Sequence, residues 1–215
     1  MGSENKKVSK RYDYWTPFYD IVDGFPLISR PQRKWKKRAV KYLNPSPGER
    51  TLDVGTGTAQ ILPWIAEKKE KGVVVGSDIS RSMIEYARKR VSGSNGGVEV
   101  KVVHDDIEDS KFPSNYFDNI ISTFTFTTVP NMRKAAEECR RILRPEGQMI
   151  VLDTGRPDKL SARPLFYPMM VSAKIFGKTH MDREMEKTLN EYFQVEMLEE
   201  NLLGMVYTLR CKPNI

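Results

Sequence analysis

Short apolar runs alternate with helically spaced apolar residues between residues 51 and 153. The runs, rich in Val and Ile, predict five buried strands at residues 51–54, 73–77, 98–103, 117–124 and 148–153. The intervening spacing predicts helices at residues 60–71, 80–91 and 131–143. Strands that are apolar on both faces and alternate with helices are typical of parallel sheets covered on both sides. The pattern therefore predicts a doubly wound α/β fold, with a mostly parallel sheet.

The two ends of the chain differ from this central pattern. Residues 1–48 predict a helical front section, which the breaker run Asn44-Pro45-Ser46-Pro47-Gly48 ends. Residues 192–200 and 203–211 predict an antiparallel hairpin at one edge of the sheet. We expect one structural domain, in which section 1–48 caps the substrate side and residues 49–215 bind the ligand.

A glycine turn follows the first predicted strand, with an acid on either side of it. Gly55 and Gly57 allow the backbone to approach a ligand closely, but Gln60 stands where a dinucleotide fingerprint has its third glycine. Asp53 precedes the turn, and Asp78, 25 positions later, ends the second strand. An acid at that second position suits the hydroxyl pair of a ribose.

The first acid discriminates between cofactors. Asp53 would lie beside the pyrophosphate of a dinucleotide and repel it, which disfavours a nucleotide-cofactor oxidoreductase. The same acid favours a ligand that carries ammonium or sulfonium charges. S-adenosylmethionine carries both charges and a ribose, and it has no phosphate. The acid and glycine set therefore predicts an S-adenosylmethionine site.

The ends of the third and fourth strands offer further candidates. Asp105 or Asp106 can accept a hydrogen bond from the exocyclic amine of adenine. The run Ser122-Thr123-Phe124-Thr125-Phe126-Thr127-Thr128 brings hydroxyls and two phenylalanines to the crevice, where they would line a substrate pocket.

These motifs together resemble the class I S-adenosylmethionine-dependent methyltransferases, and within them the UbiE/Coq5 group, which methylates ring carbons of quinone precursors. The resemblance covers most of residues 15–215. It rests on five motifs in the central part of the chain, which are Leu52–Ala59, Gly76–Ser80, His104–Ile107, Phe117-Asp118 and Leu143–Gly147. It also rests on a front motif at Tyr19-Asp20 and Arg33-Lys34-Trp35-Lys36.

The resemblance implies S-adenosylmethionine as methyl donor, S-adenosylhomocysteine as product, and no metal. It implies cofactor contacts at Asp53, Gly55, Thr56, Gly57, Asp78, Ile79, Met83, Asp105, Asp106, Ile107, Ser122 and Thr123. On the substrate side it points to Tyr19, Arg33, Phe124 and Thr127. Tyr19 and His180 are the candidates for the catalytic base, which the sequence does not identify.

One departure from the group concerns the acceptor. The group has Phe-Gly-Leu-Arg-Asn after the fourth strand, whereas this chain has Phe124-Thr125-Phe126-Thr127-Thr128, without the Arg and Asn. A quinone-precursor ring carbon is therefore one acceptor, and the amine of a phospholipid or small molecule is the alternative. A binding protein without turnover is a further alternative.

The segment of about residues 157–190 also departs from the group and is interpreted as a lid-like insertion. Its stretch 163–177 is apolar and rich in Met and aromatic residues. Together with the front section, such a stretch would build an apolar pocket for a lipid-like molecule.

Charge and cysteine content complete the expectations. The net charge of +7 lies entirely in residues 1–41, which hold eleven Lys and Arg against four Asp and Glu. Residues 30–41 could therefore contact an anionic membrane surface, whereas no nucleic-acid module is evident. Cys139 and Cys211 form no disulfide framework or metal-ligand spacing. We expect a cytoplasmic protein, in part peripheral to the membrane, and leave the oligomeric state open.

Overall fold

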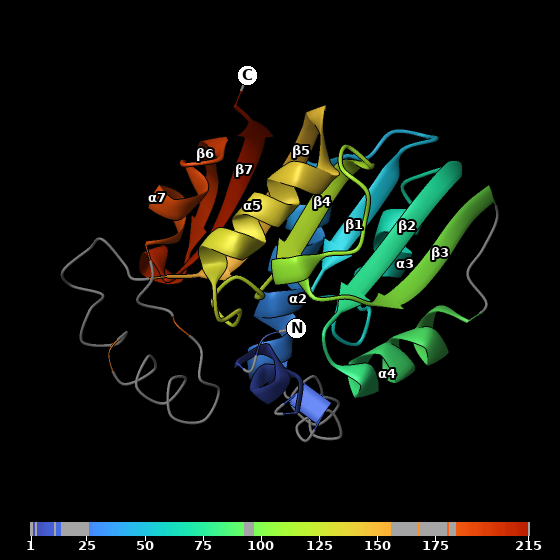
Figure 1. The fold of residues 1–215 in the computed structure, drawn as a ribbon, viewed down its shortest axis with the longest axis horizontal. Helices are drawn as coiled ribbons and strands as arrows, with labels where there is room; N and C mark the ends of the chain where they lie inside the picture. The colour runs from blue at the N-terminus through green and yellow to red at the C-terminus, as the bar shows by residue number, and fades with distance from the viewer. Residues whose placement is uncertain are drawn as a thin grey trace.

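A seven-stranded sheet with the order β3-β2-β1-β4-β5-β7-β6 forms the centre of the molecule (Figure 1). β1 to β5 run parallel, and β7 pairs antiparallel with both β5 and β6. This arrangement confirms the predicted doubly wound fold and its antiparallel C-terminal strands. The computed structural model describes residues 2, 4–10, 12–13, 26–92, 97–155, 167, 180 and 184–214.

The elements follow the order that the hydrophobic pattern predicts. The strands are β1 (Arg50–Val54), β2 (Lys71–Asp78), β3 (Gly97–His104), β4 (Phe117–Thr123), β5 (Leu143–Thr154), β6 (Phe193–Asn201) and β7 (Val206–Pro213). The helices are α2 (Pro26–Leu43), α3 (Leu62–Ala66), α4 (Arg81–Val91), α5 (Met132–Ile142) and α7 (Met185–Leu189), with short 3₁₀ turns at Ile107–Asp109 and Leu202–Gly204. Residues 4–10 are also helical.

Helices cover both faces of the sheet and divide the core in two. α2, α3 and α4 bury their apolar residues against one face. α5 and α7 bury theirs against the other, and α5 crosses the front of the sheet in Figure 1. α2 supplies the fully buried Ala39 and Leu43, and the Leu43 carbonyl accepts a hydrogen bond from the Gln148 side chain at 2.8 Å. α2 therefore belongs to the same core as the sheet.

Two helix starts form as their sequences predict. Ser80 caps α4 by accepting a hydrogen bond from the backbone of Met83 at 3.2 Å. Asn131 caps α5 in the same way through Lys134. Five residues of α5 between Met132 and Ile142 are buried at the spacing of one helix face.

The structure corrects two boundaries. The helix predicted at residues 60–71 spans only Leu62–Ala66, because the Lys69 amine turns inward and donates to the Glu49 carbonyl and the Thr51 hydroxyl. The strand predicted to begin at residue 148 begins at Leu143, and residues 144–147 form its irregular start. There Arg144 pairs with Asp118, and the register shifts between Phe117 and Asn119. Both errors arise from contacts distant in sequence, which local propensity does not contain.

The described part of the chain contains no helix with the length and apolarity needed to cross a membrane. Cys139 and Cys211 are both free and buried. Burial raises the pKa of the Cys211 thiol to about 12 and raises that of Cys139 as well.

The carboxyl ends of the parallel strands share one edge of the sheet, at the bottom of Figure 1. The strand order reverses between β1 and β4, which are direct neighbours. Open α/β sheets bind ligands in the crevice at such a reversal. The helical residues 4–10 lie against this same edge.

Candidate active site

The turn after β1 places two glycines, Gly55 and Gly57, at the point where the strand order of the sheet reverses. Gly55 and Gly57 have φ angles of +67° and +54°, which glycine adopts without strain. A Cβ at Gly55 would lie 2.3 Å from the Thr125 hydroxyl oxygen, so that position has no room for a side chain. Thr125 itself donates to the Val54 carbonyl at 3.1 Å. The turn is therefore packed tightly against the segment that follows β4.

Asp53 is a buried acid with one unused oxygen. Its side chain is 1% exposed, and one carboxylate oxygen accepts from the Thr56 hydroxyl at 2.6 Å. The other oxygen has no hydrogen-bond partner among the described residues. Burial raises the pKa of Asp53 to about 7, against the lowering effects of the Thr56 bond and the Lys36 charge. A buried carboxylate with an unused acceptor fits an ammonium group supplied by a ligand.

Asp78 holds the same turn from the end of β2. Its carboxylate accepts from the backbone N–H groups of Gly57 and Ser80, each at 2.9 Å. Burial raises the pKa of Asp78, while these backbone bonds act in the opposite direction. Each oxygen keeps a lone pair for a further donor, so the geometry is compatible with a ribose diol. The two acids and the glycine backbone thus fit the cofactor that the sequence predicts.

Asp105 and Asp106, the two acids predicted to bind adenine at the end of β3, accept hydrogen bonds from other residues of the protein. Asp105 accepts from the Ser110 hydroxyl at 2.7 Å and from the Lys111 backbone at 3.0 Å, so it organises the turn after β3. Burial raises its pKa. Asp106 caps the short turn that starts at Ile107, through the backbone of Glu108.

The N-terminal segment contacts these strand ends, which the sequence did not indicate. The Asn5 amide donates to both oxygens of Asp106, at 3.0 and 2.8 Å, and the Ser9 hydroxyl donates to the Ile79 carbonyl at 3.0 Å. Asp13 accepts from the hydroxyls of Ser80 and Ser82. Their only signal in the sequence is a polar residue every four positions, which is too common to single them out. Met83, which was predicted to contact the cofactor, is buried in α4.

The fourth and fifth strand ends form a second polar cluster. Thr127, which stands where the resembled group has Arg, donates its hydroxyl to Asp153 at 2.8 Å. Asp153 is fully buried, and burial raises its pKa to about 6. Ser122 is buried with a hydroxyl that has no partner among the described residues, and Thr123 lies half-buried beside it. Phe124 has a left-handed φ of +59°, a strained conformation typical of functional sites.

Two charged residues of this region escaped the sequence interpretation. Asp153 ends a strand that reads as ordinary core, and only its place opposite Thr127 reveals it. Lys36 projects from α2, where its amine donates to the Gln60 side chain at 2.9 Å and lies 6.0 Å from the Phe124 ring centre. Its charge lowers the pKa of Asp53. The front motif contains Lys36, which was the signal available for it.

The remaining predicted residues lie elsewhere or outside the described residues. Tyr19 and most of the lid-like insertion are outside the described residues, whereas residues 184–190 of the insertion are described and include α7. The His180 backbone donates to the Thr127 carbonyl at 2.7 Å, which places its chain near the fourth strand end. Arg33 lies over the Trp64 ring at 5.6 Å, in a cavity on the α2 side of Gln60.

Comparison with known proteins shows which proteins this chain is similar to. A family model described as a methyltransferase domain matches residues 52–151. A demethylmenaquinone methyltransferase of Listeria monocytogenes is 28% identical over 84% of this chain and 78% of its own length. The ubiquinone/menaquinone biosynthesis C-methyltransferase UbiE of Vibrio cholerae is 29% identical over 93% of this chain and 78% of its own length.

Solved structures agree on the fold. The YcgJ protein from Bacillus subtilis superimposes with a TM-score of 0.70 at 14% sequence identity, over 85% of this chain and 99% of the other. At this identity the likeness concerns the architecture of the sheet and its helices.

Proposed function

Because this chain is a class I S-adenosylmethionine-dependent methyltransferase similar to the UbiE proteins, we propose that it methylates a lipid-like acceptor, first of all a ring carbon of a quinone precursor. The observation that carries this choice is the similarity to two quinone-pathway C-methyltransferases over most of the chain.

In this proposal the cofactor is held by the residues around the reversal point. Asp53 binds the ammonium group, the backbone of the Gly55–Gly57 turn lies along the ligand, and Asp78 accepts from the ribose hydroxyls. S-adenosylmethionine supplies a methyl group that its sulfonium already activates. The chain therefore has to position the acceptor and to exclude water, and positioning is the larger contribution in such reactions.

The proton of the acceptor is assigned to Asp153. A ring carbon beside a phenol becomes nucleophilic when the phenol loses its proton, so the site needs a base. Asp153 lies at the end of β5, and the pKa of about 6 leaves it ionised at neutral pH. Thr127 holds both of its oxygens, because the Thr127 backbone N–H donates to one and the Thr127 hydroxyl donates to the other.

The alternative acceptor is an amine of a phospholipid or a small molecule. Thr127 in place of the group's Arg favours it, since no guanidinium occupies that position to bind a quinone oxygen. An amine must be neutral to react, and Asp153 would accept its proton in the same way.

Labelled methyl transfer into a total lipid extract tests the acceptor. We expect label from S-adenosylmethionine in the neutral, quinone-containing fraction, with the Asp53→Asn variant as a matched control that incorporates much less label at the same cofactor concentration. Label confined to the polar head-group fraction would assign the amine alternative. No label in any fraction, from protein that binds S-adenosylmethionine, would contradict turnover and leave a binding protein.

Asp153→Asn tests the base. The amide keeps the shape of the side chain but accepts no proton, so we expect turnover to fall by about 100-fold or more. Cofactor affinity should stay within about twofold, because Asp53 and Asp78 are unchanged. Turnover of the wild-type enzyme should rise with pH around 6, as Asp153 ionises, and this rise should be absent in the variant. An identical pH profile in both proteins would remove Asp153 from proton transfer.

A further inference from the structure

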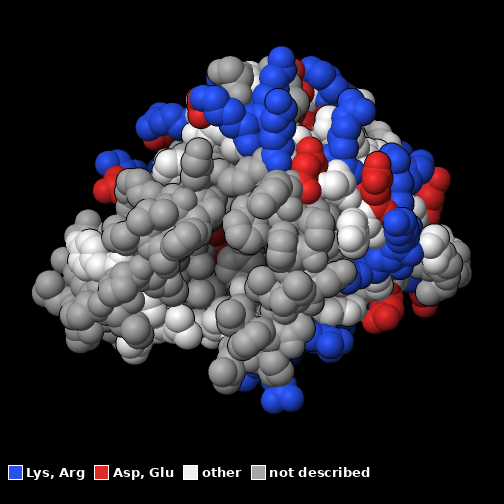
Figure 2. All heavy atoms as spheres, turned by 90° about the horizontal axis from the view of Figure 1, so that it is seen from below, with Lys and Arg blue, Asp and Glu red and all other residues white. Residues whose placement is uncertain are grey.

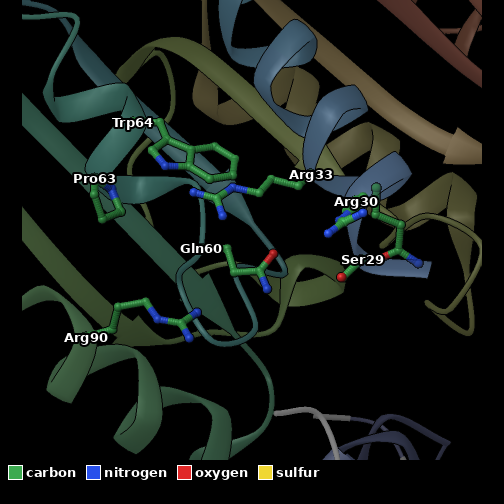
Figure 3. Close-up of a pocket in the computed structure, with 8 residues that line it drawn as sticks. Ser29, Arg30, Arg33, Gln60, Pro63, Trp64 and Arg90 are labelled. Atoms are coloured by element: carbon green, nitrogen blue, oxygen red, sulfur yellow. The ribbon is translucent and has the colours of Figure 1, made fainter. Parts of the chain in front are cut away.

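A cavity of about 570 Å³ opens between α2, α3 and α4, on the α2 side of Gln60. We call it the arginine pocket, because Arg30, Arg33 and Arg90 contribute to its wall. In Figure 3, Arg33 reaches from α2 toward the Trp64 ring, and Arg90 reaches from α4 toward Gln60. The remaining lining residues are Ser29, Gln32 and Pro63.

The arginine pocket concentrates positive charge without internal compensation. Its lining contains no Asp or Glu, and within the described part of the chain no salt bridge involves Arg30, Arg33 or Arg90. All three side chains are exposed. Like charges gathered around one cavity repel each other, so the arrangement becomes favourable when an anion enters it.

Two of the arginines are also held in place. Arg90 donates to the carbonyl and the hydroxyl of Thr58 at 2.8 and 2.9 Å. Arg33 stacks over Trp64, with its guanidinium carbon 5.6 Å from the ring centre. A guanidinium that is already oriented loses less entropy when it forms a two-pronged bond with an anion. Gln60 completes the wall, and Lys36 fixes its amide.

The surroundings are of the same sign. Lys34, Lys37 and Lys41 of α2 are exposed beside the pocket arginines, and the first 41 residues hold the whole net charge of the chain. Figure 2 shows lysine and arginine side chains gathered along the upper border and the right side of the face seen from below. Such a field raises the local concentration of anions near the pocket.

We propose that the arginine pocket binds the phosphate group of an anionic ligand, which is either the head group of a phospholipid or a soluble phosphorylated molecule. Guanidinium forks match the spacing of phosphate oxygens, and the volume exceeds that of one phosphate, so the group attached to it has room beside Trp64. The arginine pocket is lined by residues other than Asp53, Asp78 and Asp153. The proposal is therefore independent of the acceptor that receives the methyl group.

Binding measurements with matched variants test this proposal. Pyrophosphate serves as the soluble probe, measured by calorimetry, and phosphatidylcholine vesicles with and without phosphatidylglycerol serve as the membrane probe, measured by cosedimentation. We expect Arg33→Gln and Arg90→Gln to weaken binding to the relevant probe by about tenfold each. Lys34→Gln and Lys89→Gln remove the same charge from neighbouring positions outside the lining, and should stay within about twofold.

Each outcome decides the proposal. Pyrophosphate binding that depends on the two arginines supports a soluble ligand, whereas arginine-dependent binding to phosphatidylglycerol vesicles alone supports a lipid head group. Equal losses in the arginine and lysine variants would show a diffuse charge effect and overturn the pocket. Binding of the wild-type protein to neither probe would overturn it as well. Among the described residues, no backbone group accepts a hydrogen bond from the Arg33 side chain, so Arg33→Gln keeps the test valid if Arg90→Gln disturbs the Thr58 turn.

Discussion

Asp53→Asn should weaken S-adenosylmethionine binding by about 100-fold, measured by calorimetry at pH 7. The unused carboxylate oxygen of Asp53 is assigned to the cofactor ammonium, and a buried charge-assisted bond of this kind contributes about 2–3 kcal/mol. The asparagine amide keeps the volume and can still accept from Thr56. Affinity within twofold of the wild type would show that Asp53 does not contact the cofactor.

The same carboxylate should make cofactor binding depend on pH. Its pKa of about 7 in the free protein means that Asp53 is mostly neutral at pH 5.5 and half ionised at pH 7. Only the ionised form attracts an ammonium group, so wild-type affinity should increase by about tenfold between pH 5.5 and pH 7. An α-amino group itself stays charged over this range. Asp53→Asn should show no such increase, and an equal increase in both proteins would assign the titration to another group.

Without the cofactor, the Asp53→Asn variant should be more stable than the wild type at pH 7.5. The folded-state pKa lies above the ordinary value of 3.8, so the folded protein binds more protons than the unfolded chain between these two values. The contribution of Asp53 to stability therefore declines as pH rises from about 4 to about 7. Thermal unfolding at pH 4.5 and 7.5 measures this, and the advantage of the variant should appear only at the higher pH.

Gly55→Ala should destabilise the protein by roughly 2–5 kcal/mol and abolish cofactor binding. The left-handed φ of +67° costs a non-glycine residue about 1–2 kcal/mol, and the new Cβ would lie 2.3 Å from the Thr125 hydroxyl oxygen. Crowding of this kind adds about 1–3 kcal/mol, since the turn and Thr125 have to move apart. Urea unfolding measures the stability, and calorimetry measures the binding.

Gly57→Ala is the matched control for Gly55→Ala. Gly57 has a similar φ of +54°, but a Cβ there would meet no atom within 4 Å. It should therefore cost only the backbone strain, about 1–2 kcal/mol. Equal destabilisation by the two substitutions would show that the contact with Thr125 does not limit the turn.

Much of the fold follows from local patterns in the sequence. The alternation of apolar strands and amphipathic helices predicts every strand of the sheet to within a few residues, apart from the early start of β5. The helix caps Ser80 and Asn131 each accept a hydrogen bond from a residue three positions later, so their role can be predicted from the local sequence. The end of α3 cannot be predicted in this way, because Lys69 donates to Glu49 and Thr51, which lie 20 and 18 positions earlier.

The candidate site divides in the same way. Asp53 and Asp78 can be assigned from sequence, because parallel strands end at one edge and an acid at a strand end has to lie there. Lys36 and Asp153 cannot, because their significance comes from neighbours on other elements. Asn5 belongs to the same class, since 101 positions separate it from Asp106.

The sequence alone thus predicts the doubly wound fold and the edge of the sheet at which we propose that the cofactor binds, because hydrophobic period and glycine conformation are local properties of the chain. Only the tertiary structure shows that Thr127 pairs with Asp153, that Asn5 of the N-terminal segment contacts Asp106, and that three arginines from α2 and α4 line one pocket. These features depend on side chains that packing brings together across long stretches of chain. Periodicity does not encode such partners, so they emerge only when the helices are packed on the sheet.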